Sequence, residues 1–238
     1  MQGLLSLLFP PQCSLCDALT AEDFALCPDC WRDTPFIHGL VCDACGAPLL
    51  GEDEGQAELC DECLAHPRPW TRGRAAMLYR DNGRKLVLAL KHGDRTELAR
   101  TAAPWLLRAA RPLIGERTLV APVPLHRGRL FRRRYNQSAL LSARLARLAR
   151  CEHCPDLLVR RRRTPSQEGR SREARFANLA GAIEAHPRRA GRMRGRDVLL
   201  VDDVMTSGAT LAAAAGACLA AGAAEVKVVV LSRVAMDD

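Results

Sequence analysis

The sequence predicts an α/β protein, in which a small cysteine-rich module precedes an open, mostly parallel sheet with flanking helices. Eight of the eleven cysteines form four C-x2-C pairs before residue 64. Further along, an apolar run at 198–201 ends in two aspartates and leads through a short turn into an alanine-rich segment, as expected of a buried parallel strand and its helix. The 238 residues have room for one ordinary α/β domain besides the module. We therefore expect the module over residues 1–68 and the α/β domain over residues 69–238.

The turn after the apolar run predicts a phosphosugar site. Asp202 and Asp203 follow the run, and consecutive side chains on a strand point to opposite faces. One carboxylate can therefore reach a diol or a hydrated Mg2+ while the other meets a hydroxyl or the backbone. A glycine in the turn tolerates positive φ, and a helix from about Ala209 to Ala221 directs its N-terminus at the same point. We expect a phosphate against Thr206, Ser207, Gly208, Ala209 and Thr210. The alternative is an ordinary strand–turn–helix unit without a ligand.

The cysteine pairs indicate structural zinc. Two cysteines at i and i+3 present both thiolates to one cation, and two such pairs complete a closed tetrahedral shell. Four pairs therefore predict two zinc ions that stabilise a module with few large apolar groups, whereas redox-active dithiols are the less favoured alternative. The simplest assignment is sequential, with Cys13, Cys16, Cys27 and Cys30 on one ion and Cys42, Cys45, Cys60 and Cys63 on the other; a cross-braced pairing stays open. The lone pair Cys151/Cys154 favours structural thiols over a third metal site.

Charge and hydropathy limit the classes of partner. Between Arg127 and Arg196 there are 20 arginines against five acidic residues, which predicts a basic face for a phosphorylated substrate or a nucleic acid, unless the arginines reflect a GC-rich genome. No apolar run approaches the roughly 18 to 20 residues of a membrane span, and residues 1–11 lack the features of a signal peptide. We therefore expect a cytoplasmic protein without membrane insertion, in agreement with the paired cysteines.

Three further segments carry candidate ligands. Lys91 ends an expected helix at 84–91 that follows an expected strand near Met77, and it is either a partner of the helix dipole or a ligand of pyrophosphate. The run 119–126 predicts a strand ended by two prolines, with an arginine-rich loop after it and a helix from near Asn136. The basic segment 160–178 is either a loop over the site or a solvated surface loop.

The segment from Val198 to Thr210 resembles the phosphoribosyl pyrophosphate (PRPP) motif of type I phosphoribosyltransferases, with Asp-Asp followed by Thr-x-Gly-x-Thr. The resemblance implies the fold of that family, with Asp202 and Asp203 serving the ribose hydroxyls and residues 206–210 binding the 5'-phosphate. It also implies Mg2+ bound with the pyrophosphate.

Segments along nearly the whole chain are similar to one branch, the ComF/GntX family. They are the cysteine-rich N-terminus, 90–94 (LKHGD), 122–126 (PVPLH), 133–137 (RRYNQ), 164–167 (TPSQ) with Arg175 and Asn178, and the PRPP loop. The chain has Arg134 where the family pattern often has glycine. The substrate-binding residues that these segments offer are Lys91, His126, Arg127, Arg133, Asn136, Gln137, Gln167 and Arg175.

The resemblance implies two functions of different classes. The first is a PRPP-binding protein that, if active, transfers a phosphoribosyl group to an acceptor the sequence does not identify and releases pyrophosphate. The second is a factor that handles single-stranded DNA together with a DNA-uptake machinery, with PRPP or ribose 5-phosphate as a regulator. Aromatic residues for base stacking make up only 4% of the chain, which speaks against the second function. A third, less favoured reading is an interaction module whose phosphate site is vestigial.

Overall fold

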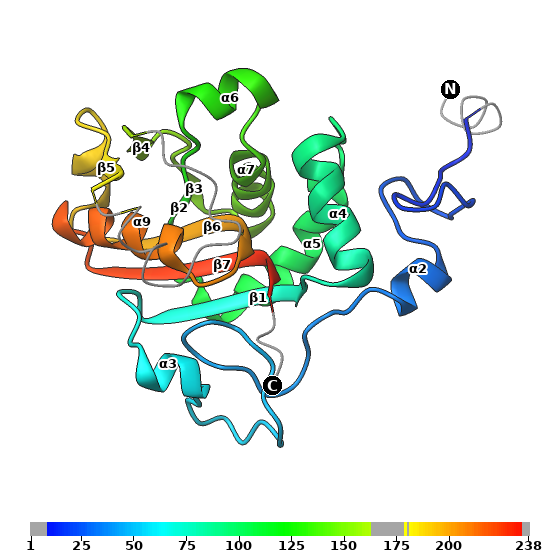
Figure 1. The fold of residues 1–238 in the computed structure, drawn as a ribbon, viewed down its shortest axis with the longest axis horizontal. Coiled ribbons are helices and arrows are strands. Elements are labelled where there is room, and N and C mark those ends of the chain that lie inside the picture. The colour runs from blue at the N-terminus through cyan, green and yellow to red at the C-terminus, as the bar shows by residue number, and fades with distance from the viewer. Residues whose placement is uncertain (1–8, 163–178, 180, 235–238) are drawn as a thin grey trace.

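The computed structural model describes residues 9–162, 179 and 181–234, which centre on a five-stranded sheet (Figure 1). The strand order is β1-β7-β6-β2-β3, and every neighbouring pair is parallel. The strands are β1 (Arg72–Leu78), β2 (Leu119–Pro122), β3 (Glu152–His153), β6 (Asp197–Met205) and β7 (Glu225–Arg233). The open parallel sheet expected from the sequence is therefore present.

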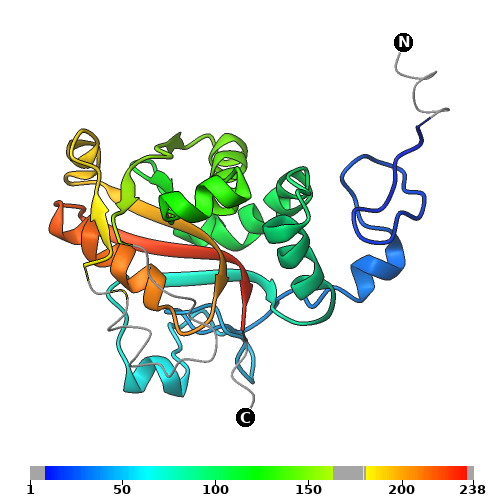
Figure 2. The same ribbon diagram turned by 45° about the horizontal axis from the view of Figure 1, so that its top comes forward.

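Helices cover both faces of this sheet (Figures 1 and 2). One face packs against α4 (Asp81–His92), α5 (Leu98–Ala110) and α7 (Gln137–Ala149), and the other against α9 (Ala209–Ala220). Shorter elements are η1 (Arg111–Leu113), α6 (Arg127–Arg133), η2 (Ala190–Met193) and the antiparallel pair β4 (Leu158–Arg160) and β5 (Ile183–Ala185). Within the described ranges no helix has the length and apolar character to cross a membrane.

Strand β6 shows why its sequence reads as a continuous apolar run. Leu199 and Val201 join the cluster formed with α4, α5 and α7, whereas Val198 and Leu200 join the cluster formed with α9. Successive side chains of a strand alternate between faces, so a strand covered on both sides has an apolar residue at every position. This burial fixes the position of the aspartates that end the run.

The N-terminal cysteine region contacts the α/β core at two places. Its first half, which contains α2 (Pro28–Arg32), lies against α4 and α5, and on α5 Ser14 Oγ is 2.9 Å from Thr101 Oγ1 and Arg100 stacks on Phe24. Its second half, which contains α3 (Asp61–Ala65), packs on β1. Gly46 permits this approach, because a Cβ atom there would lie 2.6 Å from the main-chain nitrogen of Ala75.

Two local expectations are corrected by the structure. Strand β1 begins at Arg72, earlier than the Met77 start that the sequence suggested, because its first half is covered by the cysteine region. The arginine-rich segment after His126 is the helix α6 and not a loop, and the His126 ring nitrogen caps its first turn by accepting from the Gly128 amide at 3.1 Å. Arg134 ends α6 in the left-handed conformation at φ 65°, so the turn is kept without glycine.

Candidate functional site

The connection between β6 and α9, residues 206–210, forms a tight turn that we call the phosphate loop. Gly208 has φ 79° and caps α9, a conformation that residues with a Cβ atom rarely adopt. Together with Asp202, Val204, Met205 and Leu211, the loop surrounds a hollow of about 20 Å³. The amide groups at the start of a helix are free to bind an anion, so this hollow has the donors and the dipole that a phosphate requires.

The two aspartates have different partners. Asp202 Oδ1 accepts hydrogen bonds from Ser138 Oγ at 2.7 Å and from the main-chain nitrogen of Asp203 at 2.9 Å. Asp203 Oδ2 lies 3.1 Å from Lys91 Nζ, at the last turn of α4. Burial and the neighbouring Asp203 charge raise the pKa of Asp202 to about 7, and the Ser138 hydrogen bond opposes this rise. Near neutral pH this carboxyl group can therefore gain or lose a proton when a ligand binds.

Both aspartates line a hollow of about 500 Å³ at the carboxyl ends of the parallel strands. This is where ligands bind in open α/β sheets. Burial lowers the pKa of His92 in this hollow, and the nearby Arg133 and Lys91 charges lower it further, so both effects favour the neutral ring. The cationic side chains that line the hollow are Arg84, Lys91, Arg129, Arg133 and Arg160. A ligand with several negative charges is the natural occupant.

The structure brings most of the predicted ligand residues to this hollow. Lys91, Arg133 and Gln137 line it with the two aspartates, Thr206 and Thr210. Ser207, Gly208 and Ala209 line the small hollow of the phosphate loop. Gln167 and Arg175, and with them most of the basic segment 160–178, lie outside the described residues.

Three predicted ligand residues lie elsewhere. His126, Arg127 and Asn136 line a second hollow of about 550 Å³, which shares only Pro124, Leu125 and Arg160 with the first. Asn136 also caps α7, because its Oδ1 accepts from the Ser138 amide at 3.0 Å while its Nδ2 donates to the Val123 carbonyl at 3.0 Å. The two residues of the Asn-Gln pair thus have different roles, because Asn136 caps helix α7 and Gln137 lines the first hollow.

Sequence reasoning missed Ser138, and it indicated the segments of two site arginines without singling these residues out. Ser138 follows the Asn-Gln pair and reaches Asp202, and a serine in the first turn of a helix gives no warning of such a contact. Arg129 and Arg160 lie in arginine-rich segments, in which the sequence could not separate the residues that face the hollow from those that face solvent.

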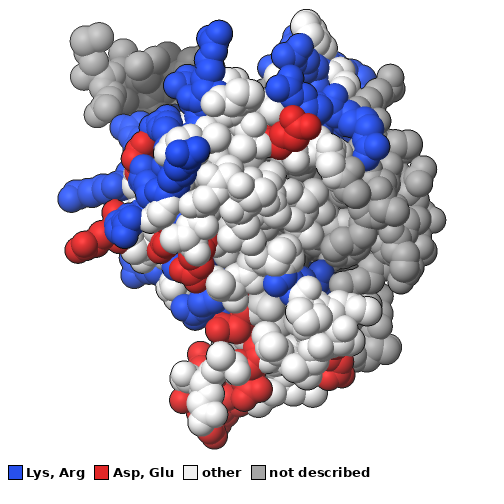
Figure 3. Space-filling model, turned by 90° about the vertical axis from the view of Figure 1, so that its left-hand side faces the viewer, with Lys and Arg blue, Asp and Glu red and all other residues white. Residues whose placement is uncertain are grey.

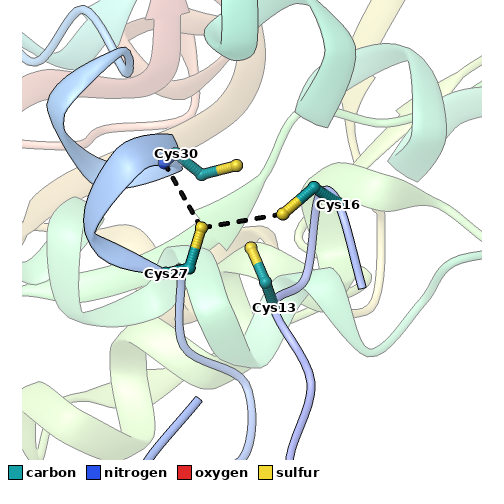
Figure 4. Close-up of side chains that lie close together, drawn as sticks. All are labelled: Cys13, Cys16, Cys27 and Cys30. Atoms are coloured by element: carbon teal, nitrogen blue, oxygen red, sulfur yellow. Dashed lines mark hydrogen bonds between the residues drawn. The ribbon is translucent and has the colours of Figure 1, made fainter. Parts of the chain in front are cut away.

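The eight N-terminal cysteines form two separate groups of four, in the sequential order. Within each group all four Sγ atoms lie within 4.8 Å of one another. Figure 4 shows the first group, in which the thiols of Cys13, Cys16, Cys27 and Cys30 point toward a common centre. Cys16 Sγ is 3.6 Å from Cys27 Sγ, and Cys45 Sγ is 3.7 Å from Cys60 Sγ. Zn–S bonds of about 2.3 Å give a tetrahedral edge of about 3.8 Å, so both groups fit zinc.

The remaining pair, Cys151 and Cys154, is not part of such a group among the residues that the structure describes. Cys154 is buried in the core, and its Sγ lies 3.3 Å from an Arg192 nitrogen. The burial of Cys154 is compatible with a structural thiol, and the preference for structural thiols over a third metal site stays a prediction.

Comparison with known proteins agrees with this architecture. A family described as "Double zinc ribbon domain" matches residues 4–64, and one described as "Phosphoribosyl transferase domain" matches residues 136–236. DNA utilization protein YhgH of Escherichia coli (strain K12) is 32% identical over 228 residues, which cover 93% of this chain and 89% of that protein. Competence protein F of Haemophilus influenzae is 30% identical over 191 residues, which cover 78% and 80%.

Two enzymes are among the solved structures that partly resemble this chain. An allosteric regulatory enzyme of purine biosynthesis has a TM-score of 0.40 at 19% identity, over 60% of this chain and 30% of that one. A hypoxanthine phosphoribosyltransferase from Staphylococcus aureus has a TM-score of 0.35 at 12% identity, over 61% and 69%. The family matches and the parallel sheet confirm the expected fold class, a phosphoribosyltransferase-type α/β core preceded by a double zinc ribbon.

Proposed function

We propose that this chain, which belongs to the ComF family together with DNA utilization protein YhgH and competence protein F, binds PRPP at the carboxyl ends of its parallel strands. The observation that carries the proposal is the arrangement of Asp202, Asp203 and Lys91 around one hollow that adjoins the phosphate loop. A diol, a phosphate and a pyrophosphate each find suitable partners there. These three groups together define PRPP among phosphorylated sugars.

In this proposal each part of PRPP has its own partners. The 5'-phosphate lies in the phosphate loop, and the ribose hydroxyls donate to the carboxylates of Asp202 and Asp203. The pyrophosphate extends toward Lys91, Arg129 and Arg133, where the cations offset its charge. Hydroxyls that reach Asp203 compete with its ion pair, so Lys91 becomes available to the pyrophosphate.

Magnesium fits the same donors, because Mg2+ prefers carboxylate and phosphate oxygens and keeps several waters. Asp202 and Asp203 would hold it together with the pyrophosphate, and the ion would supply charge neutralisation of the leaving group. We also propose one structural Zn2+ in each four-cysteine group. Such thiolate sites require a reducing compartment, and we therefore place the protein in the cytoplasm.

Calorimetric titration tests the binding proposal. PRPP with Mg2+ is expected to bind with one site per chain, and ribose 5-phosphate is expected to bind more weakly because it lacks the pyrophosphate. Competition by ribose 5-phosphate checks that both occupy one site. The absence of saturable PRPP binding in a chain that contains about two zinc ions would sink the proposal.

Transfer of the phosphoribosyl group is the enzymatic form of the proposal. The bond between ribose C1 and the pyrophosphate oxygen breaks, its electron pair leaves with pyrophosphate, and an acceptor nucleophile bonds to C1. Cations placed at the leaving group stabilise it as it departs, and the bound orientation supplies most of the remaining rate. A screen of nucleobases and amines for PRPP-dependent release of pyrophosphate identifies the acceptor class. If no acceptor raises the rate of pyrophosphate release above that of simple PRPP hydrolysis, PRPP is assigned a regulatory role.

DNA handling is a second candidate function, favoured by the surface of α6. Phe131 is 86% exposed there and is flanked by Arg132 and Arg133. Lys and Arg also gather on the upper part of the face shown in Figure 3, whereas Asp and Glu predominate at its lower end. An exposed aromatic ring among cations suits stacked bases and phosphates.

The DNA proposal predicts measurable binding of single-stranded DNA at low salt. Phe131→Ala is expected to weaken it by about fivefold to a hundredfold, as for the loss of one stacked base. Leu148→Ala, which removes an exposed apolar side chain from α7, is the matched control and is expected to change little. Equal affinities for both variants and the unmodified protein would remove α6 from the DNA site.

A further inference from the structure

Two buried arginines connect the second four-cysteine group to the phosphate loop. The side chains of Arg68 and Arg233 are each 2% exposed. Arg68 follows α3, and Arg233 ends β7, so they approach the loop from different elements. Buried arginines need partners for their donors, and most of the partners here belong either to the cysteine group or to the main chain at the loop.

Arg68 donates to three different acceptors. Its Nε donates to Cys63 Sγ at 3.4 Å, and its Nη2 donates to Glu62 Oε1 at 2.8 Å. Its Nη1 donates to the main-chain carbonyl oxygen of Ser207, within the phosphate loop, at 2.6 Å. The planar guanidinium thus fixes the distance between a zinc-ligand thiol and the loop backbone.

Arg233 makes a parallel connection. Its Nη2 donates to Glu62 Oε2 at 3.1 Å, so the two oxygens of Glu62 hold one arginine each. Its Nη1 donates to the carbonyl oxygens of Thr206 at 2.7 Å and Met205 at 3.3 Å. Glu62 lies between Cys60 and Cys63, and the zinc-binding turn itself therefore places it.

These contacts have an electrostatic and a geometric consequence. Four thiolates around Zn2+ leave about two negative charges on the group, which buried guanidinium groups offset. The same guanidinium groups hold the carbonyl oxygens of three consecutive residues, Met205, Thr206 and Ser207. Gly208 completes the packing, since a Cβ atom there would lie 3.1 Å from both Arg68 Nη1 and a Trp70 ring carbon.

We propose that Glu62, Arg68 and Arg233 are positioning residues through which the second zinc site sets the conformation of the phosphate loop and hence its affinity for the phosphorylated ligand. The identity of that ligand rests on the proposed function. The first four-cysteine group makes its contacts on α4 and α5, where Asn82 Nδ2 donates to the Cys30 carbonyl at 3.1 Å. The two zinc sites therefore have different roles, the first in docking the ribbon and the second in supporting the ligand site.

The test compares Arg68→Gln with Arg74→Gln in the full chain. Arg74 is the matched control, because it lies on β1 and its described hydrogen bonds and ion pair go to Asp43 of the same cysteine region and to the Gly73 carbonyl. Three quantities are measured for each variant, namely the zinc content, hydrogen exchange of the amides of residues 206–210 without ligand, and PRPP affinity with Mg2+. A far-ultraviolet circular dichroism spectrum checks that each variant is folded.

Arg68→Gln is expected to keep about two zinc ions, to exchange its loop amides faster, and to bind PRPP about 10-fold to 100-fold more weakly. Arg74→Gln is expected to match the unmodified protein in loop exchange and to stay within about twofold of it in affinity. Glu62→Gln is expected to reproduce the Arg68→Gln exchange pattern, because it removes the charge that both arginines share.

The outcomes separate the two proposals. Unchanged loop exchange and unchanged affinity in Arg68→Gln would overturn the positioning role. If the unmodified protein does not bind PRPP but Arg68→Gln still accelerates exchange in the loop, the positioning role stands and the PRPP proposal fails. If Arg68→Gln and Arg74→Gln lose affinity equally, the effect is general loosening of the ribbon, and the specific connection is refuted.

Discussion

Lys91 Nζ lies 3.1 Å from Asp203 Oδ2, so the last turn of α4 and the end of β6 meet in an ion pair that lines the candidate site. The Lys91 side chain is 21% exposed and that of Asp203 is 6% exposed. From the sequence, Lys91 was either a dipole partner at a helix end or a ligand of pyrophosphate. In the structure Lys91 lies at the end of the helix and also lines the hollow, so it can serve both as a partner of the helix dipole and as a ligand of pyrophosphate.

Replacing Lys91 by glutamine is expected to weaken PRPP binding by about tenfold or more, because a hydrogen bond to a charged group contributes about 1.5–3 kcal/mol. Lys85→Gln, on the same helix and exposed, is the control and is expected to leave the affinity unchanged. Calorimetric titration of both variants makes the comparison. Equal affinities in the two would remove Lys91 from the ligand site.

The raised pKa of Asp202 predicts a pH-dependent stability. Its pKa is about 7 in the folded protein against 3.8 for the free side chain, so the unfolded chain loses this proton at a lower pH than the folded protein does. Stability from this group therefore declines as pH rises from about 4 to about 7. Asp202→Asn keeps an oxygen for Ser138 and removes the charge, and is expected to stabilise the protein by up to about 4 kcal/mol at pH 8. Denaturation in urea at pH 8 and at pH 4 measures the difference, which should nearly vanish at pH 4. A gain of equal size at both pH values would show that charge is not its cause.

Gly208, the glycine of the phosphate loop, is expected to tolerate replacement less well than Gly216 of α9. At φ 79° an alanine costs about 1 kcal/mol in backbone strain, and its Cβ would press on Arg68 and Trp70 at 3.1 Å. Gly208→Ala should therefore lower both stability and PRPP affinity. Gly216→Ala, in the middle of α9 with nothing within 4 Å of the added carbon, should instead stabilise by about 0.5–1 kcal/mol. Thermal denaturation compares the pair, and a stable Gly208→Ala variant would contradict the assigned backbone.

Arg134 gives an independent test of the backbone at the end of α6. Its φ of 65° suits glycine, so Arg134→Gly is expected to stabilise the protein by up to about 1 kcal/mol. Arg132→Gly, inside the same helix, is expected to destabilise by about 1 kcal/mol. Equilibrium unfolding of the two variants should show changes of opposite sign. A loss of stability in both would mean that Arg134 does not occupy the left-handed region.

The sequence predicted the parts of the fold that local patterns determine. The apolar run 198–201 predicted β6, the small residues after Gly208 predicted α9, and the cysteine spacing predicted two groups of four. Helix α6 was missed because the five arginines in and after it and the two prolines before it are typical of a loop. Its exposed Phe131 adds no buried apolar position that would have indicated a helix, and the cap by His126 is visible only in the structure.

The site was predictable where one segment carries it, and incomplete where distant segments meet. The loop and its aspartates are local, and their motif is visible in one line of sequence. Ser138 and the arginines Arg68 and Arg233 reach the site only through the fold, because their partners lie far away along the chain. No periodicity distinguishes such an arginine from a solvent-exposed one.

The most direct test of the central claim is a titration of PRPP and Mg2+ into the zinc-loaded chain and into its Asp202→Asn/Asp203→Asn variant. Asp197→Asn, at the start of β6 and away from the hollow, serves as the control for charge removal on the same strand. We predict saturable binding, with one site per chain, for the unmodified protein and the control, and affinity lowered by about a hundredfold in the double variant. Equal binding by all three proteins, or binding by none, would contradict the assignment of this site to PRPP.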